Sequence, residues 1–134
     1  MRWSKHILLL LVVTIFLVAA CTKIPPSGTL KGKVTIGPLC PVERNPPDPS
    51  CQPTEETYRA WALAVVEAQS KKEVVVIIPQ LDGTFSVQLP PGDYMVDLQK
   101  SNNAIGKGGG LPLSVTINDG HTTTASINID TGIR

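Results

Sequence analysis

The feature that most constrains the fold of this chain is an alternation of apolar and polar residues with a period of two. It recurs in short segments that are separated by glycines, prolines and Asp-Gly pairs. Because successive side chains of a β-strand point to opposite faces, such segments are typical of strands with one buried face. The core positions predicted from this alternation are Val34, Leu63, Val75, Ile77, Phe85, Val87, Leu89, Tyr94, Val96, Leu98, Val115, Ile117, Ile127 and Ile129.

Three strands are predicted in the first half of the chain. The first begins at Gly28, carries Leu30 and Ile36 on the same face as Val34, and ends at Gly37. Residues 58–68 tolerate helix or strand on propensity, and we expect a strand there, allowing a helical turn at residues 53–57. Residues 70–72 then form a hairpin tip before a β-branched run, which favours a strand over residues 73–79.

Four more strands are predicted in the second half. Residues 84–89 and 94–98 flank a Pro-Pro-Gly turn, and strands around residues 113–117 and 125–129 flank an Asp-Gly turn. Residues 101–110 carry four glycines, and we expect a flexible loop there. Seven short strands without a long helix predict an all-β, seven-stranded Greek-key β-sandwich with antiparallel pairing.

The first 20 residues carry the parts of a secretory signal. Arg2 and Lys5 precede a run of 14 almost wholly apolar residues that ends in small side chains. A helix that spans a bilayer needs roughly 20 apolar residues, so this run is short for a permanent anchor. We therefore expect residues 1–20 to be a signal-peptide helix that is removed from the mature protein.

The run Val18, Ala19, Ala20, Cys21 resembles the lipobox of bacterial lipoproteins. This resemblance implies that Cys21 receives a diacylglyceryl group, that a peptidase cuts before it, and that its new amine is acylated with a fatty acid such as palmitate. The mature protein would then be held by lipid at the cell membrane or the outer membrane, on the extracytoplasmic side. The alternative is ordinary cleavage after Ala20, which would leave Cys21 as a thiol.

The mature chain is long enough for one domain. Residues 21–27 form the lipidated cysteine and a linker, and residues 28–134 form the predicted sandwich. Removal of Arg2 and Lys5 leaves 10 basic residues against 11 acidic ones. That balance favours neither nucleic acid nor an anionic surface as a partner, so the expected partners are the membrane, through the anchor, and an envelope protein or glycan.

Cys40 and Cys51 form an even pair in an exported chain, where disulfides persist. The ten residues between them include four prolines, which exclude regular secondary structure. A structural disulfide is the expected state. A metal or redox pair is the alternative, but the spacing is far from Cys-x-x-Cys and the mature chain has one histidine, His121.

The residues that could support catalysis have simpler interpretations. His121 follows a predicted turn, Glu55 and Glu56 precede a strand, and Asp93 and Asp97 lie four apart on one outer face. Residues 106–110 lack the Lys-Ser/Thr pair of a phosphate-binding loop. We therefore expect no enzyme, no cofactor and no metal site.

Trp61 has a functional alternative to burial. Carbohydrate-binding sandwiches use exposed aromatic rings as sugar platforms, which makes Trp61 the candidate ligand-binding residue. A tryptophan among alternating alanine and leucine is more often packed against the opposite sheet, and we expect that arrangement.

Residues 82–96 read DGTFSVQLPPGDYMV and resemble the carboxypeptidase regulatory-like domain, a transthyretin-like sandwich of seven strands. Residues 32–38 are similar to the first strand of that family. We interpret residues 82–96 as a hairpin with a positive φ at Gly83, a turn at Pro91 and Gly92, and Phe85 packed beside Tyr94. The resemblance implies the fold and an accessory, non-catalytic role.

Repeats of similar fold in Gram-positive adhesins join their first and last strands by an isopeptide bond between lysine and asparagine. Lys31 or Lys33 and Asn128 are the candidates by strand position. The alternation places all three on the solvent side, so this bond is not expected.

The sequence thus predicts a lipid-anchored extracytoplasmic β-sandwich with a non-catalytic structural or accessory role at the cell envelope. The alternative is a carbohydrate- or peptide-binding module presented at the surface. An enzyme fragment or an inhibitor is a third interpretation, which would require His121 beside a carboxylate in a cleft.

Overall fold

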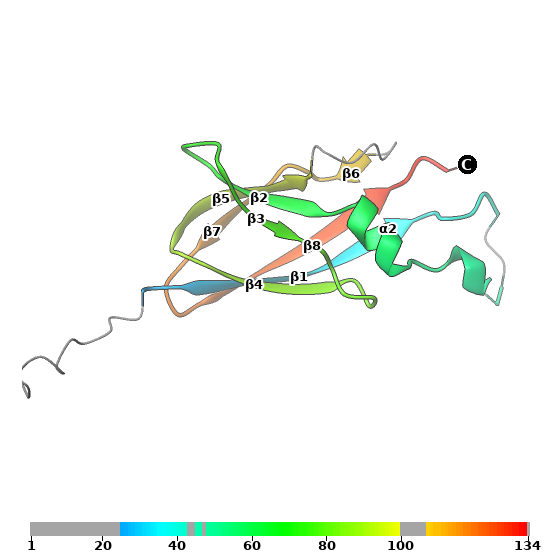
Figure 1. The fold of residues 1–134 in the computed structure, drawn as a ribbon, viewed down its shortest axis with the longest axis horizontal. Helices are drawn as coiled ribbons and strands as arrows, with labels where there is room; N and C mark the ends of the chain where they lie inside the picture. Colours follow the sequence, from blue (N-terminus) through cyan, green and yellow to red (C-terminus); the bar gives the residue numbers. More distant parts are fainter. Residues whose placement is uncertain (1–24, 43–44, 47, 100–106, 134) are drawn as a thin grey trace, which may run out of the picture.

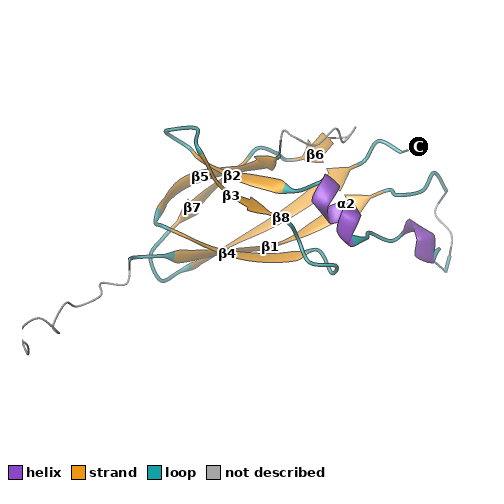
Figure 2. Cartoon of the chain, in the orientation of Figure 1, coloured by secondary structure: helices purple, strands orange, loops and turns teal. Residues whose placement is uncertain are grey.

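The computed structural model describes residues 25–42, 45–46, 48–99 and 107–133. Two four-stranded sheets face each other across a common core (Figure 1, Figure 2). The predicted signal peptide, Cys21 and most of the expected loop at residues 101–110 lie outside the described residues. No helix in the described part is long and apolar enough to cross a membrane.

The first sheet has the strand order β4-β1-β8-β6. Its strands are β4 (Thr84–Leu89), β1 (Gly28–Gly37), β8 (Thr122–Asp130) and β6 (Lys107–Gly109). β1 pairs antiparallel with β4 and parallel with β8, in an unbroken register from Thr29 opposite Thr122 to Gly37 opposite Asp130. β6 pairs antiparallel with β8 and closes one edge.

The second sheet has the order β3-β2-β5-β7, and all of its pairs are antiparallel. Its strands are β3 (Glu73–Ile77), β2 (Leu63–Glu67), β5 (Gly92–Leu98) and β7 (Leu113–Ile117). β2 and β3 form the predicted hairpin, in which Glu67 and Lys72 are joined by a backbone hydrogen bond of 2.9 Å. The register shifts between Val65 and Val66, as a β-bulge requires.

The structure confirms the all-β sandwich and corrects two details of its topology. Pairing is not antiparallel throughout, because β1 and β8 begin at the same end of the molecule and run side by side. The N–H of Gly120 before β8 donates to the carbonyl oxygen of Ser27 before β1 over 3.0 Å. The described strands also number eight rather than seven, because residues 107–109, expected in a loop, pair with β8.

The predicted hairpin over residues 82–96 is wrong, because β4 and β5 lie in different sheets. Both strands carry their apolar side chains toward the core, and Phe85 and Tyr94 therefore contribute from opposite sheets. The connection contains Pro90 and Pro91, which have no backbone N–H to donate to a hairpin ladder. Gly83 has the expected positive φ, at 80°.

The predicted strand over residues 58–68 is shorter at its start, because the chain forms helix α2 (Glu55–Ala60) first. A capping box nucleates the helix: the Thr54 hydroxyl accepts the N–H of Thr57, and the Thr57 hydroxyl accepts the N–H of Thr54. Glu55 lies in the first turn and Arg59 in the last, where each charge complements the helix dipole.

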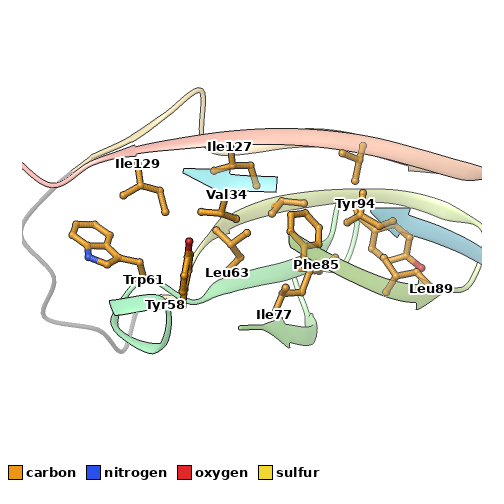
Figure 3. Packing of buried hydrophobic residues seen from close by; sticks show 14 of the residues in the cluster. Val34, Tyr58, Trp61, Leu63, Ile77, Phe85, Leu89, Tyr94, Ile127 and Ile129 are labelled. Carbon is orange, nitrogen blue, oxygen red and sulfur yellow. The ribbon is translucent and has the colours of Figure 1, made fainter. Parts of the chain in front are cut away.

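The core lies between the sheets and forms one cluster of buried side chains (Figure 3). Eleven of the predicted core residues are buried, and Val75, Val87 and Leu98 are half-buried against them. Leu30 and Ile36 are buried on the predicted inner face of β1. The core cluster also contains Tyr58 and Val65, which the alternation did not indicate, and Trp61, for which packing against the opposite sheet is the expected arrangement.

Candidate functional site

One end of the sandwich carries most of the irregular structure. β1, β3 and β8 finish at this end, and the loop between Cys40 and Cys51, the 3-10 turn η1 (Pro49–Cys51) and α2 gather there (Figure 1). Four of the five large apolar side chains that are exposed in the described residues belong to segments at this end. They are Val42, Ile78, Leu81 and Ile133.

The disulfide between Cys40 and Cys51 is present, as predicted, with the Cα atoms 5.6 Å apart. It links the chain that leaves β1 to the chain that enters α2. Asp48 begins η1 by accepting the N–H and the hydroxyl of Ser50, over 2.9 and 2.7 Å. These hydrogen bonds, from the hydroxyl first, lower the pKa of Asp48.

A groove of about 380 Å³ runs beside the second half of β1. We call it the β1 groove. One wall is residues 33–39, and the other walls are residues 51–53, Tyr58 and the turn at residues 81–82. It therefore lies between the disulfide-closed loop, α2 and the turn that precedes β4.

The β1 groove exists because β4 is shorter than β1. Pairing between the two strands ends at Lys33 opposite Thr84, and one further bond joins the N–H of Val34 to the carbonyl oxygen of Gly83 over 2.8 Å. Figure 1 shows β1 continuing past the start of β4 toward α2. In the described part of the chain, no strand pairs with this side of β1 beyond Val34.

Ile36 is the residue whose backbone faces the groove. Backbone groups of alternate residues in a strand point to the same side, so Ile36 points as Val34 does, away from β8. Gly37 confirms this alternation, because its carbonyl oxygen accepts the N–H of Thr131 on the β8 side, over 3.2 Å. The Ile36 side chain itself is buried in the core.

The charged groups of the groove offset each other. Asp82 accepts the hydroxyl and the N–H of Thr84 over 2.7 and 2.9 Å, and these bonds, with a smaller effect of Lys33, lower the pKa of Asp82. Burial raises the pKa of the Tyr58 phenol, and the Asp82 charge adds to that rise. The lining thus carries one cation and one anion at neutral pH, with Tyr58 uncharged.

Two further hollows lie outside the β1 groove. One borders α2 and is lined by Glu55, Arg59 and residues 78–81, with Arg59 and Glu55 in an ion pair of 3.5 Å. The other lies on the outer face of the β3-β2-β5-β7 sheet. Its lining is Ala64, Val66, Lys71, Glu73, Met95, Asp97 and Leu98.

The candidate sugar platform, Trp61, is 8% exposed and belongs to the core cluster (Figure 3). Its position at the C-terminal cap of α2 turns it between the sheets rather than toward solvent. A sugar ring therefore has no exposed face of Trp61 on which to stack, and the side chain packs in the core as expected.

The side chains considered for acid–base chemistry each bond to a local partner. His121 is exposed at the β7–β8 turn, with Nδ1 2.7 Å from the carbonyl oxygen of Asp119. Asp93 accepts the hydroxyl of Thr116 over 2.7 Å, and Asp97 accepts the N–H of Leu98 over 2.8 Å. Among the described residues, no three His, Cys, Asp or Glu side chains are arranged to hold a metal ion.

The three isopeptide candidates, Lys31, Lys33 and Asn128, are all exposed, as the alternation indicates. Lys31 and Lys33 lie opposite Thr124 and Ser126 of β8, whereas Asn128 lies opposite Thr35. The structure does not bring either lysine opposite the asparagine.

Sequence reasoning missed the β1 groove. The feature that could have predicted the groove is the difference in length between the ten-residue β1 and the six-residue β4. That difference becomes a groove only once β1 and β4 are known to be neighbours, which the alternation does not specify.

No protein-family model and no curated protein matches the sequence. The solved structures that match this chain include the following three. A DUF3823 family protein from Parabacteroides merdae is 22% identical, with a TM-score of 0.47, and the match covers 78% of this chain and 46% of that chain. The minor pilin of Streptococcus agalactiae is 16% identical, with a TM-score of 0.48 and coverages of 80% and 45%.

The major pilin subunit of Bacillus cereus is 14% identical, with a TM-score of 0.46, and the match covers 80% of this chain and 31% of that chain. The chain thus spans less than half the length of each of these three proteins. Identities and TM-scores at this level establish no family and no function.

Proposed function

We propose that this chain is a lipid-anchored extracytoplasmic β-sandwich with a non-catalytic accessory role at the cell envelope, in which Cys21 carries the lipid. The observation that carries the proposal is the separation of the two ends of the sandwich. The chain enters β1 at one end, and α2 lies at the other (Figure 2). The disulfide and the β1 groove belong to the end that carries α2.

The entry end is held firmly to the sandwich. The N–H of Ser27 donates to the Asp119 carboxylate over 2.9 Å, and the N–H of Gly120 donates to the Ser27 carbonyl oxygen over 3.0 Å. Only residues 22–26 separate this fixed point from Cys21. An extended chain covers at most about 3.6 Å per residue, so an anchor on Cys21 would keep this end within about 20 Å of the bilayer.

The opposite end would then face away from the membrane. The disulfide would persist in the oxidising space outside the cytoplasm, and exposed apolar side chains such as Leu81 would be available to a partner. Attachment by two or three acyl chains is durable, whereas a single chain gives marginal binding. This arrangement supports a role in presenting a surface.

A non-catalytic role is supported by the placement of the titratable side chains. His121 and Asp119 lie at the entry end, whereas Glu55 and Asp82 lie at the other end. General acid–base catalysis needs a side chain held within hydrogen-bond reach of the substrate proton, whereas the exposed His121 ring lies against the backbone carbonyl oxygen of Asp119. The distribution favours binding over chemistry.

We also propose membership of the carboxypeptidase regulatory-like group of transthyretin-like sandwiches. Its support is the sequence pattern over residues 82–96, the positive φ of Gly83 and the position of Tyr94 at the start of β5. The crossing of this segment between sheets revises our interpretation of the pattern as a hairpin.

The test of the anchor is the substitution Cys21→Ala in the full chain expressed in a bacterium that processes lipoproteins. We expect uncleaved precursor, or a mislocalised product whose partitioning between detergent and water differs from that of the unmodified chain. The double variant Cys40→Ala/Cys51→Ala is the matched control, because it removes two cysteines without touching the lipobox-like run. Normal processing and unchanged partitioning of Cys21→Ala would refute the anchor.

A further inference from the structure

We infer that the β1 groove binds an extended peptide segment of a partner protein, which adds to the first sheet as a short strand beside β1. A peptide ligand would be the partner of the proposed accessory role. That role enters only in placing the β1 groove on the side away from the membrane. The chemistry of the occupant follows from the groove itself.

Among the described residues, the backbone of Ile36 has no hydrogen-bond partner on the groove side, and this favours an extended peptide as the ligand. The N–H and carbonyl groups of Ile36 point into the groove past the last bond to β4, between Val34 and Gly83. A residue of an antiparallel strand satisfies such a pair by exchanging two hydrogen bonds with it. Peptides that add to a sheet edge gain affinity from these main-chain bonds and specificity from alternate side chains.

The residues that line the groove indicate which side chains the bound peptide should carry. A peptide residue opposite Ile36 points to the same face as Ile36, toward the core side of the groove beside Tyr58 and Leu81. That residue is expected to be apolar. Its two neighbours point to the outer face, where Thr35 is exposed, and are expected to be polar.

The charges of the groove select a neutral segment. Lys33 and Asp82 offset each other, and the Asp82 carboxylate already accepts two hydrogen bonds from Thr84. A strongly charged peptide would find no matching counter-charge in the lining. Binding should therefore change little with salt, unlike binding driven by charge.

The groove differs from the other unpaired edges because it has walls. β3 is also an edge strand, with Val74 45% exposed on it. An added strand at β3 would lie in the open, whereas one beside β1 would lie between the disulfide-closed loop and the turn that carries Leu81. Burial of the new main-chain bonds from water favours the β1 groove.

The experiment selects ligands from a random nonapeptide display library on the immobilised full chain, with counter-selection on the variant Leu81→Arg. Leu81 is 61% exposed, so the substitution should leave the fold intact while placing a charged side chain across the groove. The enriched peptide is then synthesised in a plain form and in a form N-methylated at its central apolar residue.

We expect the plain peptide to bind the full chain with a polar-apolar-polar pattern at its centre. N-methylation removes one main-chain bond and blocks strand addition sterically, so it should weaken binding about tenfold or more. Leu81→Arg should weaken binding similarly, and the matched exposed variant Val74→Arg on β3 should bind within about twofold of the unmodified chain.

Hydrogen exchange locates the contact. In the free protein the Ile36 amide should exchange faster than the Val34 amide, which is bonded to Gly83. The peptide should slow exchange at Ile36 specifically. The inference is overturned if no peptide survives counter-selection, if the N-methylated form binds equally, or if protection appears along β3 instead.

These outcomes are separable from the test of the anchor. If Cys21→Ala abolishes lipid attachment but the unmodified chain binds no peptide, the proposed anchor stands and the proposed peptide partner is refuted. If the chain binds peptide but Cys21→Ala is processed normally, peptide binding in the groove stands and the proposed anchor is refuted. The inference would also be overturned if the chain bound glycans on an array and bound no peptide.

Discussion

Tyr94 donates a hydrogen bond from its hydroxyl to the carbonyl oxygen of Pro90 over 2.9 Å, and this bond spans the point at which the chain changes sheets. Pro90 follows β4 in the first sheet, whereas Tyr94 belongs to β5 in the second. The two prolines of the connection donate no backbone hydrogen bond of their own. The Tyr94 hydroxyl therefore links the start of the connection between the sheets to the strand that follows it.

Removing that hydroxyl should destabilise the protein modestly. Tyr94→Phe keeps the buried ring and loses one hydrogen bond, so we expect the free energy of unfolding to fall by about 1 kcal/mol in urea titration. Tyr58→Phe is the matched control, because the Tyr58 hydroxyl makes no hydrogen bond among the described residues. Equal losses in the two variants would show that the crossover bond contributes nothing specific.

Phe85 tests the assignment of inner and outer faces. Its ring is buried between the sheets, and Phe85→Ala would leave a cavity in the core (Figure 3). We expect a loss of about 3–5 kcal/mol in the free energy of unfolding. Lys33→Ala and His121→Ala, both at exposed positions, should each cost less than about 0.5 kcal/mol. Wild-type stability of Phe85→Ala would mean that the packing described here is wrong.

Gly32 of β1 lies directly opposite Phe85 of β4, and its lack of a side chain makes room for the ring. A Cβ atom at Gly32 would lie 2.3 Å from the carbonyl oxygen of Ala125 and 2.6 Å from Cζ of Phe85. Gly32→Ala should therefore cost about 1–3 kcal/mol through overpacking.

Gly37, in the same strand, is the matched control for Gly32. A Cβ atom there meets nothing within 4 Å, so Gly37→Ala should leave the urea midpoint unchanged or raise it slightly. The contact between Gly32 and Phe85 would be refuted as a constraint if the two alanine variants behaved alike.

The disulfide should stabilise the folded chain. Closing a loop with a sequence separation of 11 constrains the unfolded chain by about 2.5–3 kcal/mol on the chain-entropy model, and Cys40→Ser/Cys51→Ser should lose about that much. Thiol titration of the unfolded Cys21→Ala chain without reductant should detect no free thiol. Two reactive thiols would contradict the bond.

The sequence by itself determined which residues face the core in most strands. Alternation is a local property, because the direction of each side chain depends only on its position along an extended backbone. Leu30, Val34, Phe85 and Ile127 could therefore be assigned before any partner strand was known. The disulfide was equally readable, since two cysteines of an exported chain have few other stable states.

The tertiary structure alone decided which strands are neighbours. A strand with one apolar face presents the same pattern whether its sequence neighbour pairs with it or crosses to the opposite sheet. The alternation therefore could not predict that β4 and β5 lie in different sheets or that β1 pairs parallel with β8. Both arise when two apolar faces close over one core.

The same reason explains the features at the end that carries α2. Residues 58–62 have propensities that suit helix or strand, and the Thr54–Thr57 capping box, together with burial of Tyr58, decided for the helix. The β1 groove is still less local, because it is the difference in length between two strands that are far apart in sequence. It exists only once long-range packing has placed β1 beside β4.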